Sequence, residues 1–289
     1  MAVIETLVAD IEEVLTHPHI VDKLVLERFG QSITRVTDRQ LLSEERTELS
    51  MSMLGTRCDR QLQYKASPYH RIKGEPLSAD AKLKFMFGDL IEALILLLAR
   101  EAGHKVEGEQ DELNINGVLG HRDSIIDGVL VDCKSASSFS FQKFKHGLRE
   151  DEDSFGYLTQ LHSYLYASVG GAVFCEPGRA AFLVVDKQFG HICLDIHSFD
   201  SKSYGDLVDE KKAIVSNPNL APRGFADEPD GKSGNRKLGT QCSYCAFKWD
   251  CWPKLQSFVY SNGPRYLTNV VRLPDVPRGA SSDDTRGEG

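Results

Sequence analysis

The sequence has no long uninterrupted hydrophobic run. Its longest apolar stretch covers 93–99, far short of the roughly 20 residues that span a bilayer, so a buried core helix is expected there. The first residues also lack a basic segment followed by an apolar one, because Glu5 and Asp10 come early, and no secretory signal peptide is expected. These absences predict a cytoplasmic protein without a membrane partner.

The chain also has fewer basic than acidic residues. Lys and Arg number 34 against 42 Asp and Glu, for a formal net charge of -8. An avid, non-specific nucleic-acid binder needs many phosphate contacts, so this balance argues weakly against that class. It does not argue against a nuclease, because a catalytic metal site needs carboxylates and local basic patches can coexist with an acidic total.

The cysteine count is odd, at seven. Without a sign of secretion, a disulfide framework is not expected. Cys133, Cys175 and Cys193 lie in or beside apolar, strand-like stretches and are predicted to be small core residues. The other four occupy polar or aromatic contexts: Cys58, Cys242, Cys245 and Cys251.

The spacing of apolar residues predicts an alternation of helices and strands. Helices are expected at 3–15, 20–29, 54–64, 78–102, 140–148, 155–168 and 204–215, with Gly30 ending the second, Ser78 capping the fourth and Gly103 closing it. Strands are expected at 113–115, 118–126, 129–134, 181–186 and 191–197. Asn116-Gly117 and Asp127-Gly128 are predicted hairpin turns.

This order predicts an α/β (α+β) layered fold in which a mixed sheet is flanked by helices. Four regions are expected. They are an N-terminal helical part that carries Cys58, 1–77; a core, 78–216; a linker and cysteine region, 217–273; and a disordered tail, 274–289. Residues 217–240 are rich in Pro, Gly and charge, as expected of a linker.

An acidic residue followed after a short gap by Asp-x-Lys points to metal-dependent phosphodiester hydrolysis. Asp123 and Asp132 are predicted on neighbouring strands, roughly opposite each other across the turn at Asp127-Gly128, so both could hold one hard divalent ion. Lys134 lies two residues beyond Asp132 and projects on the same face. There it could orient the attacking water or stabilise the developing charge.

Other residues fit the same site. Glu92 lies within a strongly apolar helix, where a lone carboxylate needs a cationic partner, and it is a candidate for a further metal ligand, direct or through water. The backbone carbonyl of Cys133 is another candidate ligand. Gln160 and Tyr164 share a helix face and could position the nucleotide or Lys134. Taken alone, however, Asp-x-Lys is common, and surface ion pairs on a hairpin are the simpler interpretation.

The segment Cys242-x-x-Cys245-x5-Cys251 has the spacing of metal ligands. A tetrahedral site needs a fourth ligand, and Cys58 is the best candidate because it lies in a polar segment. Zinc sites usually consist of two close pairs, whereas one distant cysteine plus a triplet favours an iron–sulfur cluster that joins the two ends of the chain. Structural zinc is the alternative.

Together these positions make the chain resemble the RecB-like PD-(D/E)xK nucleases, in particular the subgroup with a four-cysteine iron–sulfur cluster. That subgroup includes CRISPR-associated exonucleases, phage relatives and the nuclease domain of AddB. The matching positions run in the family's order from residue 58 to 251: Cys58, Glu92, Gly120-His121-x-Asp123, Asp132-x-Lys134, Gln160-x-x-x-Tyr164, Cys242, Cys245 and Cys251.

The resemblance implies a PD-(D/E)xK core and a DNA exonuclease, often acting 5′ to 3′ on single-stranded ends, with Mg²⁺ or Mn²⁺ and a structural 4Fe–4S cluster. Glu92, Asp123 and Asp132 would hold the metal, and Lys134 would be the catalytic lysine. Many CRISPR-associated members have histidine in place of Glu92, so glutamate favours recombination or phage DNA processing. Implied partners are DNA, a second copy of the chain, or a recombination or helicase protein.

Two other functions remain open from the sequence. One is a non-catalytic DNA-end-binding or assembly subunit that retains the nuclease fold. The other is a structural zinc protein in which Asp-x-Lys is coincidental.

Overall fold

The computed structural model describes residues 2–42, 47–200 and 204–281. Their contacts gather the chain into two compact units, the first formed by 1–55 and 77–210 and the second by 56–76 and 211–289. These units cut across the ranges that the sequence motifs suggested. The class is mixed α+β, as predicted, with one mixed and two antiparallel sheets.

The first unit contains a five-stranded sheet of order β1-β4-β5-β6-β7. Its strands are β1 (Val106–Glu107), β4 (Ser124–Ile126), β5 (Val129–Ala136), β6 (Arg179–Asp186) and β7 (Ile192–Ser198). Only β5 and β6 pair in parallel. Because helices cover both faces, the apolar runs of these two central strands are buried on both sides.

A separate hairpin joins β2 (Glu112–Ile115) to β3 (Val118–His121). Its turn residues, Asn116 and Gly117, both have positive φ. Asn and Gly tolerate that conformation, which a tight two-residue hairpin requires, and the predicted turn is confirmed.

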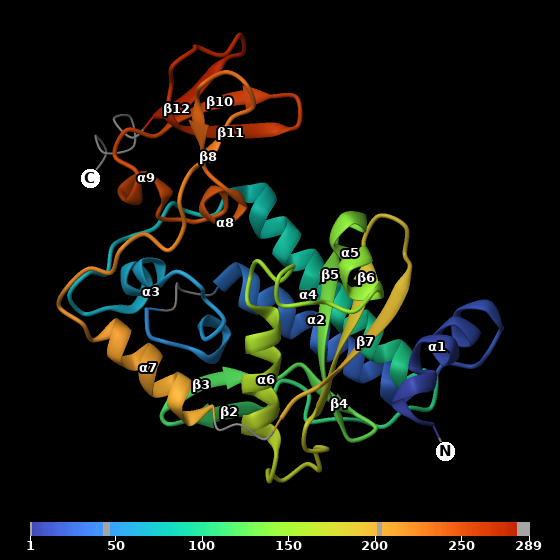
Figure 1. Cartoon of the computed structure of the whole chain (residues 1–289). Helices are drawn as coiled ribbons and strands as arrows, with labels where there is room; N and C mark the ends of the chain where they lie inside the picture. Colours follow the sequence, from blue (N-terminus) through green and yellow to red (C-terminus); the bar gives the residue numbers. More distant parts are fainter. Residues whose placement is uncertain (1, 43–46, 201–203, 282–289) are drawn as a thin grey trace. The chain divides into compact units, whose positions relative to one another are not determined.

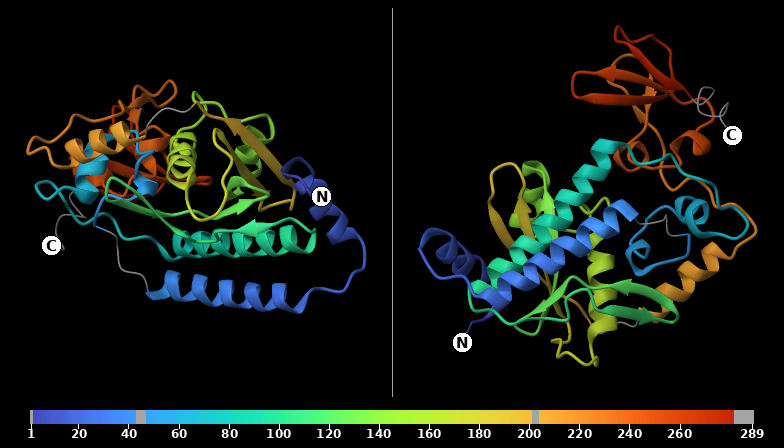
Figure 2. Two further views of the ribbon diagram at one scale, coloured as in Figure 1. Left: turned by 90° about the horizontal axis from the view of Figure 1, so that it is seen from below. Right: turned by 180° about the vertical axis from the view of Figure 1, so that it is seen from behind.

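Helices lie on both faces of the five-stranded sheet (Figures 1 and 2). One face is covered by α5 (Ser138–Lys145) and α6 (Tyr157–Ser168), and the other by α1 (Leu7–Thr16) and α4 (Ala79–Glu101). A further helix, α2 (Lys23–Leu42), packs on α4 rather than on the sheet. Short 3-10 turns occur at Ile4–Thr6 and Met51–Met53.

The alternation of side chains along β5 decides which way the candidate site faces. Leu130 and Ala136 belong to the core under α5 and α6, whereas Val129 and Val131 pack in the core under α4. Asp132 and Lys134 are two and four residues beyond Leu130 on the same strand, so their side chains also lie on the α5–α6 face.

Two predictions in this unit were wrong. The second helix does not end at Gly30 but runs to Leu42, because the downstream residues Ser32 and Val36 are buried. The strand expected at 118–126 is two strands in different sheets. It breaks at Arg122, whose buried guanidinium donates to the Gly108 carbonyl and pairs with the Asp111 carboxylate.

The second unit consists of short helices and a five-stranded antiparallel sheet. The helices are α3 (Asp59–Ala66), α8 (Thr240–Ser243) and α9 (Lys248–Cys251), and α7 (Gly205–Val215) contains the boundary between the units. The sheet has the order β12-β10-β11-β9-β8, formed by β8 (Glu228–Pro229), β9 (Arg236–Lys237), β10 (Gln256–Tyr260), β11 (Gly263–Asn269) and β12 (Arg278–Ser281).

The second unit departs from the sequence predictions in four respects. The presumed linker at 217–240 contributes β8 and β9, and the presumed disordered tail contributes β12; residues 282–289 lie outside the described ones. Strands β10 and β11 were not predicted, and Cys58 is the N-cap of α3 rather than a residue within a helix.

In the described part of the chain, no helix combines the length and apolar character needed to cross a membrane.

Candidate active site and cysteine site

One cleft of the first unit, with a volume of about 410 Å³, brings together the predicted site residues. They come from α4, the β3–β4 connection, β5 and α6. The six predicted residues that line the cleft are Glu92, Asp123, Asp132, Lys134, Gln160 and Tyr164.

The break between β3 and β4 opens this cleft. Strand β4 pairs with β5 as far as Ser124, opposite Val131, while β5 continues to Ala136 paired with β6. Asp123 stands at the break, and its Oδ2 accepts a hydrogen bond from the Cys133 N–H at 2.8 Å. The Asp123 carboxylate therefore accepts the hydrogen bond that a neighbouring strand would otherwise accept from β5. This contact places Asp123 next to Asp132.

Lys134, which is half-buried, forms an ion pair with the buried Asp132. The Lys134 Nζ lies 2.6 Å from the Asp132 Oδ2 and 5.3 Å from the centre of the Tyr157 ring. Burial lowers the pKa of Lys134, but the negative charges of Asp132 and Asp123 outweigh burial and hold the pKa above its usual value. The amine is therefore a fixed positive charge at neutral pH.

The other two carboxylates resist ionisation. Burial, followed by the nearby Asp89 charge, raises the pKa of Glu92 to about 7. Burial and the charges of Glu92 and Asp132 raise the pKa of Asp123 well above its usual range. Acidic groups gathered without enough positive charge favour binding of a cation.

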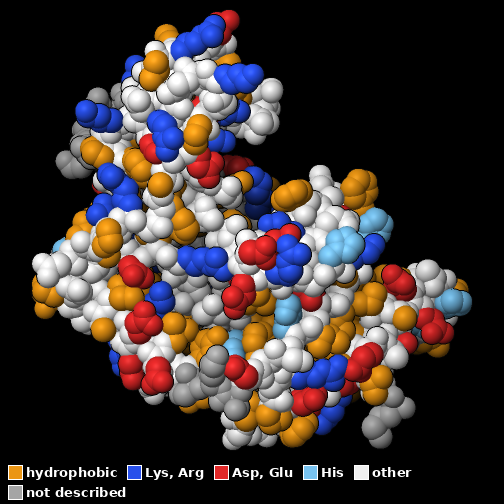
Figure 3. Space-filling model, viewed as in Figure 1, with side chains coloured by type: hydrophobic (Ala, Val, Ile, Leu, Met, Phe, Trp, Pro, Cys, Tyr) orange, Lys and Arg blue, Asp and Glu red, His pale blue; other side chains and the backbone are white. Residues whose placement is uncertain are grey.

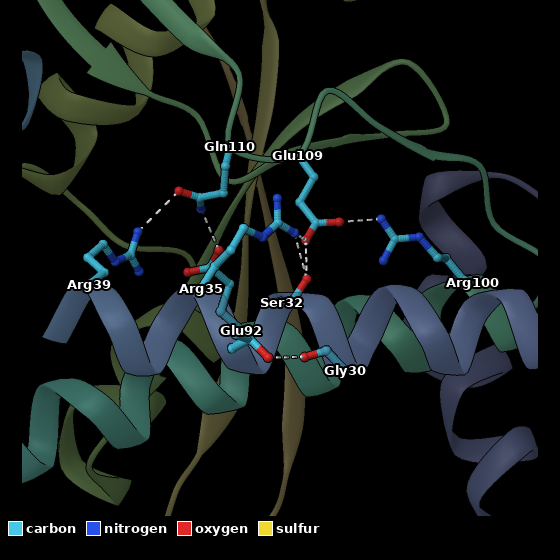
Figure 4. A network of polar contacts seen from close by, with 9 residues as sticks. Gly30, Ser32, Arg35, Arg39, Glu92, Arg100, Glu109 and Gln110 are labelled. Atoms are coloured by element: carbon cyan, nitrogen blue, oxygen red, sulfur yellow. Dashed lines mark hydrogen bonds and ion pairs between the residues drawn. The ribbon is translucent and has the colours of Figure 1, made fainter. Parts of the chain in front are cut away.

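A chain of polar contacts from the β1–β2 loop and α2 holds Glu92 (Figure 4). Gln110 Nε2 donates to Glu92 Oε1 at 2.8 Å, and Gln110 Oε1 accepts from Arg39 Nη1 at 3.2 Å. Arg39 also pairs with Asp89 at 2.8 Å. The guanidinium on α2 therefore partly offsets the acidic charge and, through Gln110, fixes the direction of Glu92.

Gln160 and Tyr164 lie one helical turn apart on α6, with Gln160 Nε2 3.5 Å from the Tyr164 hydroxyl. Burial raises the pKa of Tyr164, so the phenol stays protonated at neutral pH. Both side chains line the cleft.

Sequence reasoning missed several cleft residues. Tyr157 precedes Gln160 by three positions on α6, and Asp89 precedes Glu92 by three on α4, so helical spacing could have found both. Arg39 and Gln110 carried no local signal, because only tertiary packing brings α2 and the β1–β2 loop to the site. His121 is exposed and lines the cleft.

The residue types suit a hard divalent cation. Four carboxylates line one cleft: those of Asp89, Glu92, Asp123 and Asp132. No donor among the described residues gives the Asp132 Oδ2 a well-directed hydrogen bond, despite its ion pair with Lys134. As the side chains stand, no three His, Cys, Asp or Glu residues of the described chain enclose a single ion position. Oxygen donors of this kind are the usual ligands of Mg²⁺ and Mn²⁺.

The four remaining cysteines meet in the second unit, where Cys58, Cys242, Cys245 and Cys251 line one pocket. Burial and the charges of neighbouring cysteines raise the pKa of Cys242 to about 11 and that of Cys245 to about 12. All four are free thiols. Four sulfur donors around one pocket suit iron–sulfur or zinc chemistry.

The other three cysteines lie in or against the core of the first unit, as predicted. Cys175 is buried in it, and Cys133 and Cys193 pack against it.

Comparisons with known proteins do not assign a family. No family model matches the chain, and no curated protein matches it. Among solved structures, the crystal structure of a protein designated SSO0001 is similar at 13% sequence identity and a TM-score of 0.39, covering 79% of this chain and 96% of that one.

Proposed function

We propose that the protein is a metal-dependent DNA exonuclease with a PD-(D/E)xK-type core. The observation that carries the proposal is the convergence of Glu92, Asp123, Asp132 and Lys134 in one cleft. Phosphodiester hydrolysis uses this combination, because a cation held by carboxylates activates the water and a fixed positive charge beside it stabilises the charge that develops on the phosphate.

The arrangement of the strands supports this core. Asp123 lies at the break before β4, and Asp132 and Lys134 project from the same face of the unpaired part of β5. A phosphate can therefore reach the two carboxylates and the lysine along this flank of β5, where the described residues supply no neighbouring strand.

Each residue has a defined role in the proposal. Glu92, Asp123 and Asp132 would hold Mg²⁺ or Mn²⁺, with the Cys133 carbonyl as a further ligand; the ion, when bound, supplies an activated water and neutralises charge on the phosphate. Lys134, held by Asp132, would orient that water or stabilise the developing negative charge.

The side chains of α6 complete the proposed site. Gln160 and the protonated Tyr164 lie within reach of the same cleft and can donate hydrogen bonds to phosphate oxygens or to the nucleotide. Single-stranded ends and 5′ to 3′ polarity are the favoured substrate and direction, in DNA recombination, repair or phage DNA processing.

For the second unit we propose a structural 4Fe–4S cluster on Cys58, Cys242, Cys245 and Cys251. A ligand from the start of α3 and three from the α8–α9 region would join segments that are far apart in sequence. Iron and acid-labile sulfide in anaerobically purified protein would support the cluster, whereas zinc without iron would overturn it.

The test of the nuclease is cleavage of end-labelled single- and double-stranded DNA with Mg²⁺ or Mn²⁺. Lys134→Ala is expected to reduce the rate at least 10²-fold, whereas Lys187→Ala, which removes an exposed lysine elsewhere in the first unit, should not. Cleavage that persists in Lys134→Ala refutes the proposed site. DNA binding without cleavage by the intact protein would instead identify a non-catalytic DNA-end-binding subunit.

A further inference from the structure

The acidic charge of the chain is distributed very unevenly between the two units. The first unit contains 17 Lys and Arg against 32 Asp and Glu, a formal net charge of -15. The second contains 17 against 10, a formal net charge of +7. The total of -8 therefore conceals a basic unit of about a hundred residues.

Much of the acidic charge of the second unit is already paired. Asp59, Glu75, Asp227, Glu228 and Asp230 each lie within 4.0 Å of a Lys or Arg of the same unit. Among the described residues, no carboxylate pairs with six exposed cations: Arg71, Lys73, Lys232, Lys254, Arg272 and Arg278. The positive excess is thus at the surface.

Four of these cations belong to the C-terminal sheet or its loops. Arg278 lies on the edge strand β12 opposite Phe258, and Lys254 precedes β10. Lys232 and Arg272 come from two loops that Asn235 joins: its side chain donates to the Arg272 carbonyl and accepts the Arg272 N–H, each at 2.8 Å.

Arg265 adds to this basic character within the sheet. It faces Phe258 from the strand opposite to that of Arg278, so the two arginines flank one position on the same face. Its guanidinium lies 4.2 Å from the centre of the Tyr260 ring and pairs with Asp230. In Figure 3, basic side chains recur over the visible surface of this sheet.

We propose that the C-terminal sheet, β8 to β12, is a docking surface for the phosphate backbone of a nucleic acid. The inference rests in part on the proposed nuclease function, which supplies a polyanionic substrate. It assigns the two requirements of that function to different units: the acidic first unit provides carboxylates for the cation, and the basic second unit provides affinity for phosphate. A carboxylate-rich cleft repels DNA, so a separate basic surface offsets that repulsion.

The expected signature is a salt dependence of binding. Each phosphate neutralised by a cation contributes about 0.7 to the slope of log K against log salt concentration for single strands and about 0.9 for duplex DNA. If the four loop and edge cations all contact phosphate, replacing them with glutamine lowers the slope by about 3.

The experiment measures fluorescence anisotropy of labelled oligonucleotides with the full chain in EDTA, where no cleavage interferes, between about 50 and 200 mM salt. The variant is Lys232→Gln, Lys254→Gln, Arg272→Gln and Arg278→Gln combined. The control carries the same charge change on four exposed cations of the first unit: Lys23→Gln, Arg28→Gln, Lys145→Gln and Lys187→Gln. Circular dichroism establishes that both remain folded.

The proposal expects at least a tenfold loss of affinity at 100 mM salt, together with the lower slope, in the first variant and neither in the control. Equal losses in both variants, or none in the first, overturn it. The nuclease proposal is tested apart from this, because a wild-type protein that binds DNA through the sheet but cleaves none would refute only the nuclease. If the first variant still binds DNA but no longer binds an acidic protein, the sheet docks a protein, and the proposal that it docks nucleic acid is overturned.

Discussion

Replacing Glu92 with glutamine should stabilise the metal-free protein at alkaline pH. The raised pKa of about 7, against an ordinary value of 4.5, means that the folded state holds a proton more tightly than the unfolded state. Ionised Glu92 therefore destabilises the fold above pH 7, and the penalty disappears below about pH 4.5. A difference of this size corresponds to about 3 kcal/mol, since one pKa unit is about 1.4 kcal/mol.

Glutamine keeps the shape of the side chain and an oxygen that can still accept from Gln110 Nε2. It removes the charge that Asp89 and Asp132 repel. We expect the unfolding free energy in EDTA to rise by up to about 3 kcal/mol at pH 8, with little change at pH 4.5. Because 1 kcal/mol shifts the midpoint of a domain this size by about 2–4 °C, the gain is measurable by thermal unfolding.

The same substitution should weaken metal binding. Mg²⁺ or Mn²⁺ should raise the midpoint of the wild type at pH 8 more than that of Glu92→Gln, because binding to the folded state stabilises it by an amount that grows with the logarithm of the affinity. Asp80→Asn, which removes an exposed carboxylate of the same helix, is the matched control and should change neither result. A gain of equal size at both pH values, or no gain at pH 8, would refute the argument.

Three further outcomes are expected. Gly156→Ala should destabilise the protein by about 3 kcal/mol in urea unfolding, because Gly156 has a φ of +76° and its new Cβ would collide with the Gly55 backbone; an unchanged midpoint would contradict this packing. Cys58→Ser should remove the visible absorbance of a 4Fe–4S cluster while metal binding in the first unit persists; unchanged iron content would exclude Cys58 as a ligand. Mn²⁺ affinity should increase from pH 5.5 to pH 8, since Glu92 must lose its proton to bind, and calorimetric titration that shows no such rise would count against Glu92.

Several features could be predicted from the sequence because they depend on local physics. Ser78 precedes the start of α4, and Gly103 follows its end with a φ of +84°. The turns at Asn116-Gly117 and Asp127-Gly128 were predictable for a similar reason, since these residue types tolerate positive φ. The alternation along β5 likewise placed Asp132 and Lys134 on one face.

Local patterns gave the wrong extent for elements that depend on distant partners. Glycine is typical of a helix C-terminus, so Gly30 predicts the end of a helix. Helix α2 nevertheless continues to Leu42, because it packs against α4. The strands β8, β9 and β12 are only two to four residues long, and such segments gain their stability from hydrogen bonds to neighbouring strands rather than from their own sequence.

The sequence by itself determined the chemical types of the site, because carboxylates, a lysine and thiols are read directly from the residues and their spacing. Only the tertiary structure decided how these groups are arranged and balanced. The strand breaks at Arg122, and this break brings Asp123 beside β5. Folding also brings two residues to the site around Glu92: Arg39, more than fifty residues away in the sequence, and Gln110, eighteen residues away. It also grouped the basic residues of two distant segments into one unit, because charge and burial depend on neighbours in space, whereas sequence spacing reports only neighbours along the chain.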